Sequence, residues 1–256
     1  MQPSARVRTK AWLGGLSVLM LLALWQGLAL VLASRFLPSP VAVAGHILFL
    51  ARDAHLIADF GATLARALAG FVIAMLLGTA AGIALGRSQI ADRLFLNWVI
   101  VGMNLPAIVI AILCYIWLGL NDTALILAVV LNKTPLVITQ IRQGVLSFDP
   151  AYDEFAAAYR LSRRERFWNI QVPQLVPYLL TAGRTGLSLV WKIVLVFEVI
   201  GADSGVGFRV SLFFQFFDLK GILAYTTIFV CIVVALEHLV IGPMERRLLA
   251  WRADRG

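Results

Sequence analysis

The sequence predicts an all-α membrane protein, a bundle of six transmembrane helices. Of its 256 residues, 61% are hydrophobic and only 14% are charged, and the mean hydropathy is +0.87. A soluble domain carries about a quarter charged residues, so most of this chain needs an apolar solvent. Backbone groups in lipid must pair internally, and strand-length alternation is absent, so we expect helices to make the spans. A single membrane domain over residues 1–256 accounts for the length.

Apolar stretches of about 20 residues, the length that crosses a bilayer core, place the six spans. The predicted ranges are 11–33, 60–85, 95–118, 123–141, 175–200 and 221–243. The first follows basic residues, as a signal peptide does, but it is long enough to cross the membrane and is expected to be retained. The third lies in a charge-free run from Leu94 to Asn121 and is predicted as one span.

The distribution of Lys and Arg predicts the orientation, because cytoplasmic loops carry an excess of both. With the N-terminus inside, the cytoplasmic segments hold fourteen basic residues and the outer segments hold four. Both termini are therefore predicted to be cytoplasmic, as an even number of spans requires. The net charge of +8 lies mainly between apolar runs and forms no continuous stripe, so nucleic acid is not an expected partner.

The cytoplasmic connection 149–173 contains two predicted helix starts. Asp149 before Pro150 has the pattern of an N-cap with proline at the first helical position. Ser162 and Glu165 have the spacing of a capping box. A short helix with an aromatic face is therefore expected, followed by a bend and a basic second helix. Such a pair could dock into a groove on a soluble partner or lie on the membrane surface, and periodicity alone does not decide between these roles.

A family resemblance favours docking. The connection resembles the cytoplasmic EAA loop of binding-protein-dependent ABC permeases, and the matching positions are Glu154, Ala156, Ser162, Phe167, Val172 and Pro173. The similarity continues upstream through Thr63–Arg66 and Gly70–Ser88, and downstream through Pro177, Gly183-Arg184, Trp191, Glu198 and Gly201–Gly207. It covers roughly residues 55–245 and is closest to the sulfonate, nitrate and taurine branch. Arg160 stands near the place where the family has a loop glycine.

The resemblance implies a type I ABC importer permease of the bacterial inner membrane. The implied partners are a second permease copy, two ATPase subunits that bind ATP and Mg²⁺, an extracytoplasmic solute-binding protein and membrane lipid. The implied solute is small and anionic, such as a sulfonate, nitrate or a taurine-like compound. The implied coupling helix, which docks on the ATPase, comprises Asp153, Glu154, Phe155, Ala156, Ala157, Ala158, Tyr159, Arg160 and Leu161.

Charged residues inside predicted spans are candidates for the translocation path, because charges in lipid are costly and usually face protein or water. The candidates are Lys192, Arg184, Lys133 and Glu198. The alternative for Glu198 is a structural pair with a neighbouring helix, and Arg66 and Glu237 are expected to snorkel near span ends.

No catalytic residue or metal site is predicted. The histidines, His46, His55 and His238, form no metal-binding motif, and no phosphate-binding loop is present, so ATP hydrolysis is expected in a partner subunit and no cofactor in this chain. A membrane-embedded enzyme and a stand-alone secondary transporter are the alternatives. Neither a catalytic motif nor an inverted repeat supports them.

Overall fold

A computed structural model describes residues 4–34, 36–52 and 54–243 of the chain. The described part is almost entirely helical. In chain order the elements are α1 (Ser4–Leu32), α2 (Pro40–Leu50), α3 (Ala54–Arg87), α4 (Gln89–Asn104), α5 (Ala107–Leu118), α6 (Asp122–Leu146), α7 (Pro150–Ala158), α8 (Arg163–Arg166), the π-helix η1 (Phe167–Gln171), α9 (Val172–Gly201), α10 (Val206–Gln215), α11 (Leu219–Leu236) and the π-helix η2 (Glu237–Ile241).

Five helical stretches are long and apolar enough to cross a membrane, and a sixth span results if the bent pair α4 and α5 counts as one. The predicted ranges 11–33, 60–85 and 123–141 fall on α1, α3 and α6. The ranges 175–200 and 221–243 fall on α9 and on α11 with η2. Two connections between spans contain helices that no predicted range covered, α2 and α10.

The third span is where the prediction of one continuous helix is wrong. The range 95–118 is divided into α4 and α5, whose axes are bent by 96°. Pro106 causes the break, because it has no N–H to donate and its ring disfavours the helical conformation at the preceding residue. Leu105 is accordingly extended, with φ −69° and ψ 127°.

The contact between α3 and α6 is a seam of small residues against branched ones. Gly70, Gly78, Gly82 and Gly86 lie at positions along one face of α3, with Ala74 completing the four-residue repeat. They meet Val129, Val137, Ile141 and Val145 of α6 in the same order, so the two helices run in the same direction. A Cβ at Gly78 would lie 2.6 Å from the Val137 Cβ. Small residues at this spacing allow the close helix approach that is typical of membrane bundles.

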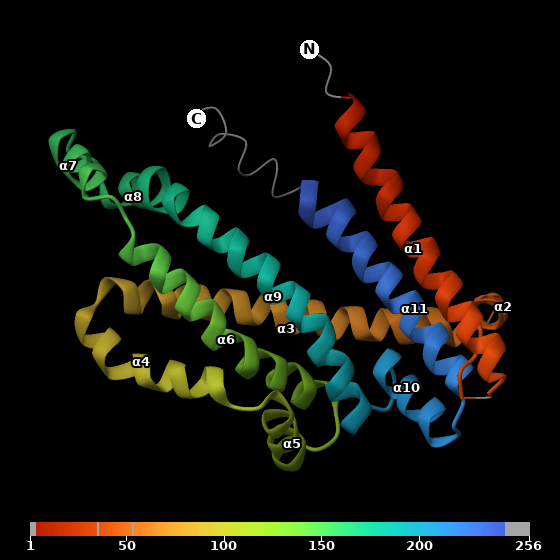
Figure 1. Ribbon diagram of the computed structural model, residues 1–256. Coiled ribbons are helices and arrows are strands. Elements are labelled where there is room, and N and C mark those ends of the chain that lie inside the picture. The colour runs from red at the N-terminus through yellow and green to blue at the C-terminus, as the bar shows by residue number, and fades with distance from the viewer. Residues whose placement is uncertain (1–3, 35, 53, 244–256) are drawn as a thin grey trace.

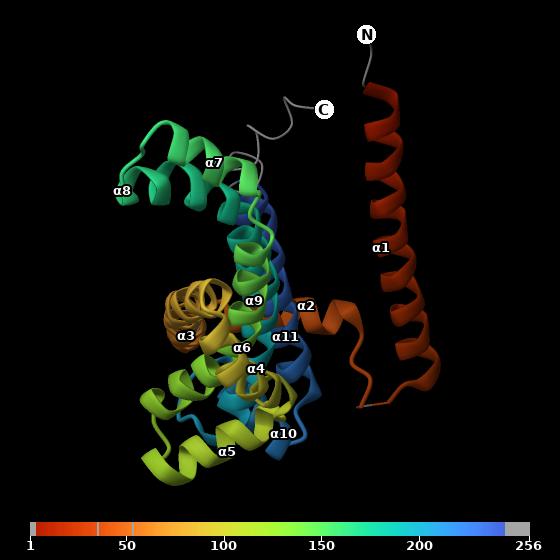
Figure 2. The ribbon, with the colours of Figure 1, turned by 90° about the vertical axis from the view of Figure 1, so that its left-hand side faces the viewer.

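Figure 1 shows α6, α9 and α11 rising toward one end of the molecule, while α3 runs across α9 and α11. Helices α7 and α8 project beyond the bundle at that same end. The first turn of α1 and the last turns of α11 also point toward it (Figures 1 and 2). Figure 2 shows that α1 stands apart from the other spans and is joined to them through α2. Large apolar side chains on α1, such as Leu19, Met20 and Val31, are exposed.

Candidate functional site

Both ends of α7 are capped by hydrogen bonds to backbone groups that the helix itself leaves unpaired. The Asp149 side chain accepts from the Ala151 N–H at 2.9 Å, and Pro150 occupies the first helical position, so the predicted N-cap is confirmed. At the other end the Leu161 N–H donates to the Ala156 carbonyl, and the Arg160 N–H donates to the Ala157 carbonyl. This pair of bonds is a Schellman motif, whose C′ residue is left-handed and usually glycine.

Arg160 occupies that C′ position with φ +50°. The backbone angle explains why a glycine is expected there. A left-handed conformation costs a non-glycine residue roughly 1–2 kcal/mol, and the capping bonds of Arg160 and Leu161 offset that cost.

Helix α8 starts at the predicted capping box, which is confirmed. The Ser162 hydroxyl accepts from the Glu165 N–H, and Glu165 Oε2 accepts from the Ser162 N–H at 2.8 Å. Beyond it, η1 carries the chain into α9 without a break. Pro173 is accommodated in the first turn of α9, directly after the π-helical turn. A π turn is a rare helical insertion that often marks a functional position.

The end of α3 holds η1 in place. Arg87, its last residue, donates from Nη2 to Gln171 Oε1, and its guanidinium lies 5.9 Å from the centre of the Phe167 ring. Gln174 Oε1, one turn later, accepts from the Asp149 N–H at 3.1 Å. These contacts join α3, the start of α7 and the base of α9. Arg87 could not be recognised from the sequence alone, because Gln171, to which it donates, lies 84 positions away.

Most of the predicted docking residues on α7 are exposed. Tyr159 is 69% exposed and its ring lies 4.5 Å from that of Phe155, measured between centroids. Glu154, Ala157 and Ala158 are also exposed. Ala156 is an exception, since it is only 4% exposed and packs within the chain. Asp153 is exposed but pairs with Arg166 of α8 at 2.6 Å, which fixes α7 against α8. A hollow beneath α7 is lined by Tyr152, Phe155, Leu161, Asn169 and Ile170.

The opposite end of the bundle contains a buried charge cluster. Glu198 of α9 is fully buried and accepts from Arg66 Nη1 at 2.8 Å, from the Thr63 hydroxyl at 2.8 Å and from the Gly207 N–H at 2.9 Å. Arg66 also donates from Nε to Asp122 and from Nη1 to the Ser204 carbonyl. The cluster therefore ties α3, α6, α9 and the loop before α10 together.

The glycines of the 201–207 segment allow this closure. Gly205 has φ +102°, which side-chain-bearing residues rarely adopt, and a Cβ there would lie 2.6 Å from Glu198 Cδ. A Cβ at Gly207 would lie 2.7 Å from Glu198 Cβ. The loop thus covers the carboxylate because no side chain intervenes. Nearby, Asp59 accepts from Arg209 Nε at 2.7 Å and from the Tyr225 hydroxyl at 3.2 Å.

Two of the sequence expectations about charges need correction. Glu198 is enclosed within the chain by its hydrogen bonds, so its role here is the structural pair and not the wall of a path. Arg66 does not snorkel, because it is 4% exposed and its guanidinium is bound on several sides. Both side chains lie in apolar stretches, and only the folded structure brings their partners to them.

The remaining path candidates differ in exposure. Lys133 is 5% exposed and lies on α6 between Val129 and Val137, in register with Ala74 of the glycine seam. Within the described residues it has no hydrogen-bond or ion-pair partner. Lys192 is exposed on α9, as is Arg184, which already has an interaction partner.

Lys192 belongs to a polar stripe on α9. Thr181, Thr185, Ser188 and Lys192 recur at spacings of four, three and four, and all are exposed. Residues at these spacings share one face of a helix. A lysine at the centre of a lipid-facing helix costs about 2.5–3.5 kcal/mol on insertion scales, so this face is expected to meet protein or water.

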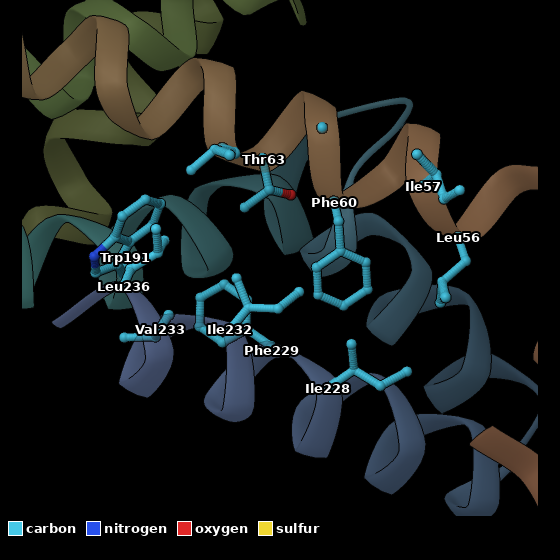
Figure 3. Close-up of a pocket in the computed structure, with 12 residues that line it drawn as sticks. Leu56, Ile57, Phe60, Thr63, Trp191, Ile228, Phe229, Ile232, Val233 and Leu236 are labelled. Atoms are coloured by element: carbon cyan, nitrogen blue, oxygen red, sulfur yellow. The ribbon is translucent and has the colours of Figure 1, made fainter. Parts of the chain in front are cut away.

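A cavity of about 340 Å³ lies between α3, α9 and α11 (Figure 3). Its walls are apolar, with Phe60, Trp191 and Phe229 among the lining side chains, and Thr63 at its edge directs its hydroxyl to Glu198. A polar solute finds almost no hydrogen-bonding groups there. In the described residues, no group of three or more His, Cys, Asp or Glu side chains could hold a metal ion.

The family model for "Binding-protein-dependent transport system inner membrane component" matches residues 70–242. The chain belongs to this family. This permease is 28% identical to the taurine transport system permease protein TauC of Escherichia coli (strain K12), over 94% of the chain and 90% of TauC. It is 26% identical to the putative aliphatic sulfonates transport permease protein SsuC of Bacillus subtilis (strain 168), over 94% and 88% of the two chains. It is 23% identical to the nitrate import permease protein NrtB of Synechococcus elongatus, over 81% and 82%.

A structure of the MetNI methionine ABC transporter in an inward-facing conformation shares the fold, with a TM-score of 0.67 at 15% identity, over 75% of the permease and 95% of that chain. The predicted fold class, a type I importer permease, is confirmed. The permease is a multi-pass inner-membrane subunit of an ABC transporter and not an enzyme, since ATP hydrolysis belongs to a separate subunit of such systems.

Proposed function

We propose that the permease, as a homodimer, forms the translocation path of an importer for a small oxyanion such as a sulfonate. Two ATPase subunits, which bind ATP and Mg²⁺, dock on the two copies of α7. A solute-binding protein delivers the solute from the opposite side. The observation that carries the proposal is that α7 projects from the bundle (Figure 1) and that Phe155 and Tyr159 are exposed there. Exposed aromatic side chains on a short helix suit a groove on a soluble protein.

The orientation in the membrane follows from this docking. ATP is cytosolic, so the end that carries α7 and α8 faces the cytoplasm, and the start of α1 and the end of α11 lie on that side. The excess of Lys and Arg in the segments assigned to the cytoplasm supports the same orientation. The buried cluster of Arg66 and Glu198 then lies near the outer surface.

Support for an oxyanion comes from the polar stripe of α9 and from the taurine, sulfonate and nitrate systems to which the relatives belong. Lys192 supplies a positive charge on an exposed helix face, and no acidic residue occurs in α9 before Glu198. Lys133 and Arg184 remain secondary candidates, because one is buried in the seam and the other is already engaged.

Co-expression of the permease with its cognate ATPase tests the proposal. We expect a stable complex with two copies of each subunit, measured by light scattering, and nucleotide hydrolysis that depends on the ATPase. A permease that purifies without any ATPase, or that transports solute alone, would contradict it. Cysteine labelling of α7 from either side of sealed vesicles tests the orientation separately.

A further inference from the structure

We propose that Thr185, Ser188 and Lys192 of α9 form the oxyanion-binding site of the translocation path. The site rests on the proposed function, because it takes the solute that the importer carries. It lies in the middle of α9, away from both α7 and the charge cluster around Glu198.

Helix α9 has two faces of opposite character. One face packs inside the chain and is apolar or small, with buried residues Ala182, Gly186, Val190, Trp191 and Val194. The other face is exposed and carries the hydroxyls and the lysine, with Leu189 as an exposed apolar residue beside them. A helix whose exposed face met only lipid would show the reverse pattern, with its polar groups turned inward. The exposed face of α9 therefore lines water or a partner, as a translocation path requires.

The chemistry of this face suits an oxyanion. From Thr185 to Lys192 is seven residues, or about 10 Å along the axis, so the three side chains lie within two helical turns. The ammonium supplies charge and three donors, and each hydroxyl supplies one more. Sulfonate and nitrate oxygens only accept hydrogen bonds, so every group of the site complements them. Within the described residues, none of the three side chains has a hydrogen-bond or ion-pair partner inside the chain that would compete with the solute.

Thr181 is left out of the site because its hydroxyl donates to the Pro177 carbonyl at 2.9 Å. Beyond Lys192, toward the end of α9 at Gly201, the exposed face becomes apolar, with Val196 and Val199. The polar stripe therefore ends at Lys192 on the side toward Gly201, so the site lies at that end of the stripe.

Charge-selective cysteine modification tests the site on the purified permease–ATPase complex, in a background with Cys114→Ala and Cys231→Ser. Ser188→Cys is treated with two water-soluble methanethiosulfonate reagents, one carrying a sulfonate and the other a trimethylammonium group. Rates are measured without nucleotide and after trapping with ATP and vanadate. We expect Ser188→Cys to react in at least one state and the sulfonate reagent to be preferred. Leu76→Cys, at an exposed apolar position of α3, should be unreactive.

The preference should depend on Lys192. Adding Lys192→Gln should lower the ratio of the two rates about ten-fold, because a unit charge a few ångströms away favours one reagent and disfavours the other. Lys192→Arg should preserve the ratio, and so should Lys220→Gln, which removes an exposed lysine at the start of α11. Elution as a single symmetric peak shows that each variant is folded.

Two results would overturn the site. If Ser188→Cys is as unreactive as Leu76→Cys in both states, the stripe does not meet water. If it reacts without charge preference, or if Lys192→Gln leaves the ratio unchanged, the stripe lines water but does not select anions. Failure of the proposed function looks different, because the complex with the ATPase would then not form at all.

Discussion

Arg66 and Glu198 form an ion pair at 2.8 Å although 132 positions of sequence separate them, and neither side chain reaches solvent to any useful extent. The pair is completed by Thr63, by the Gly207 N–H and by Asp122. Its position, where α9 ends and the loop to α10 turns back, makes it a clamp on the end of the bundle opposite α7. An opening movement at that end must move this cluster as one body or separate it.

Removing only one partner of the clamp should be strongly destabilising. Arg66→Met leaves the Glu198 carboxylate buried without a counter-charge, and we expect a loss of about 3–5 kcal/mol in the free energy of unfolding. The measurement is the thermal unfolding midpoint of the purified permease in detergent. The double variant Arg66→Met/Glu198→Met should recover much of the loss, and equal destabilisation of the single and double variants would show that the ion pair itself is unimportant.

The glycine seam should tolerate no added methyl group. Gly78→Ala places a Cβ 2.6 Å from the Val137 Cβ, so α3 and α6 must separate, at an expected cost of about 1–3 kcal/mol. Gly61→Ala on the same helix is the matched control, because nothing lies within 4 Å of its Cβ position. We expect that control to be neutral or stabilising, since alanine favours the helix. Equal effects of the two substitutions on thermal unfolding would contradict the close packing of the seam.

The features that the sequence predicted correctly are local ones. The caps at Asp149 and Ser162 depend on residues within three positions, and those patterns report backbone needs directly. Hydropathy likewise locates apolar stretches, because the membrane acts on each segment by itself. Pro106 could have predicted the break between α4 and α5, but the charge-free composition around it indicated one span.

The clamp could not be predicted in the same way, and neither could the contacts of Arg87 with Phe167 and Gln171, called here the joint at Arg87. Arg66 and Glu198 stand in apolar surroundings, and their pairing depends on how α3, α9 and the loop before α10 pack. Arg87 resembles any basic residue at a helix end until Phe167 and Gln171 are placed beside it. A sequence pattern reports such partners only when they share a helix.

Arg160→Gly should stabilise the end of α7. The residue has φ +50°, and glycine adopts this conformation without steric strain, so we expect a gain of about 1 kcal/mol in local stability. Amide hydrogen exchange at Leu161, whose N–H closes the Schellman motif, should slow by about five-fold. Faster exchange at that amide would show that the arginine side chain contributes more to the turn than its backbone strain costs.

Substitutions that change the charge of the exposed face of α7 should uncouple ATP hydrolysis from the permease. Tyr159→Asp removes a 69% exposed ring and Glu154→Lys inverts a charge, and we expect each to weaken docking by about 2 kcal/mol, the size of an interface hot spot. The readout is ATPase stimulation by the permease in proteoliposomes. Ala151→Asp is the control, since it adds a negative charge in the first turn of α7, where the helix dipole favours it. Normal stimulation by the Tyr159 and Glu154 variants would remove α7 from the interface.

Loosening the joint at Arg87 should separate ATPase docking from movement of the bundle. Arg87→Ala leaves α7 intact but removes the hydrogen bond to Gln171 and the stacking on Phe167, through which α3 follows η1. We expect the complex with the ATPase to form normally, while uptake per ATP hydrolysed falls about ten-fold, the effect of losing one charge-assisted hydrogen bond. Spin labels at Leu76 and Arg164 should show one narrow distance in the parent protein, with and without nucleotide, and a broadened distance in the variant.

The pairing of Arg87 with Gln171 makes this expectation specific. Gln171→Ala should reproduce the part of the loss that the hydrogen bond causes, and the double variant should be no worse than Arg87→Ala alone, because Arg87→Ala already removes that bond together with the Phe167 contact. Arg93→Ala provides the matched control, since Arg93 is a nearby exposed arginine with no hydrogen-bond or ion-pair partner among the residues that the structure describes. Additive losses in the double variant, or an equal loss in Arg93→Ala, would mean that the basic charge of this end of the bundle matters and the joint does not.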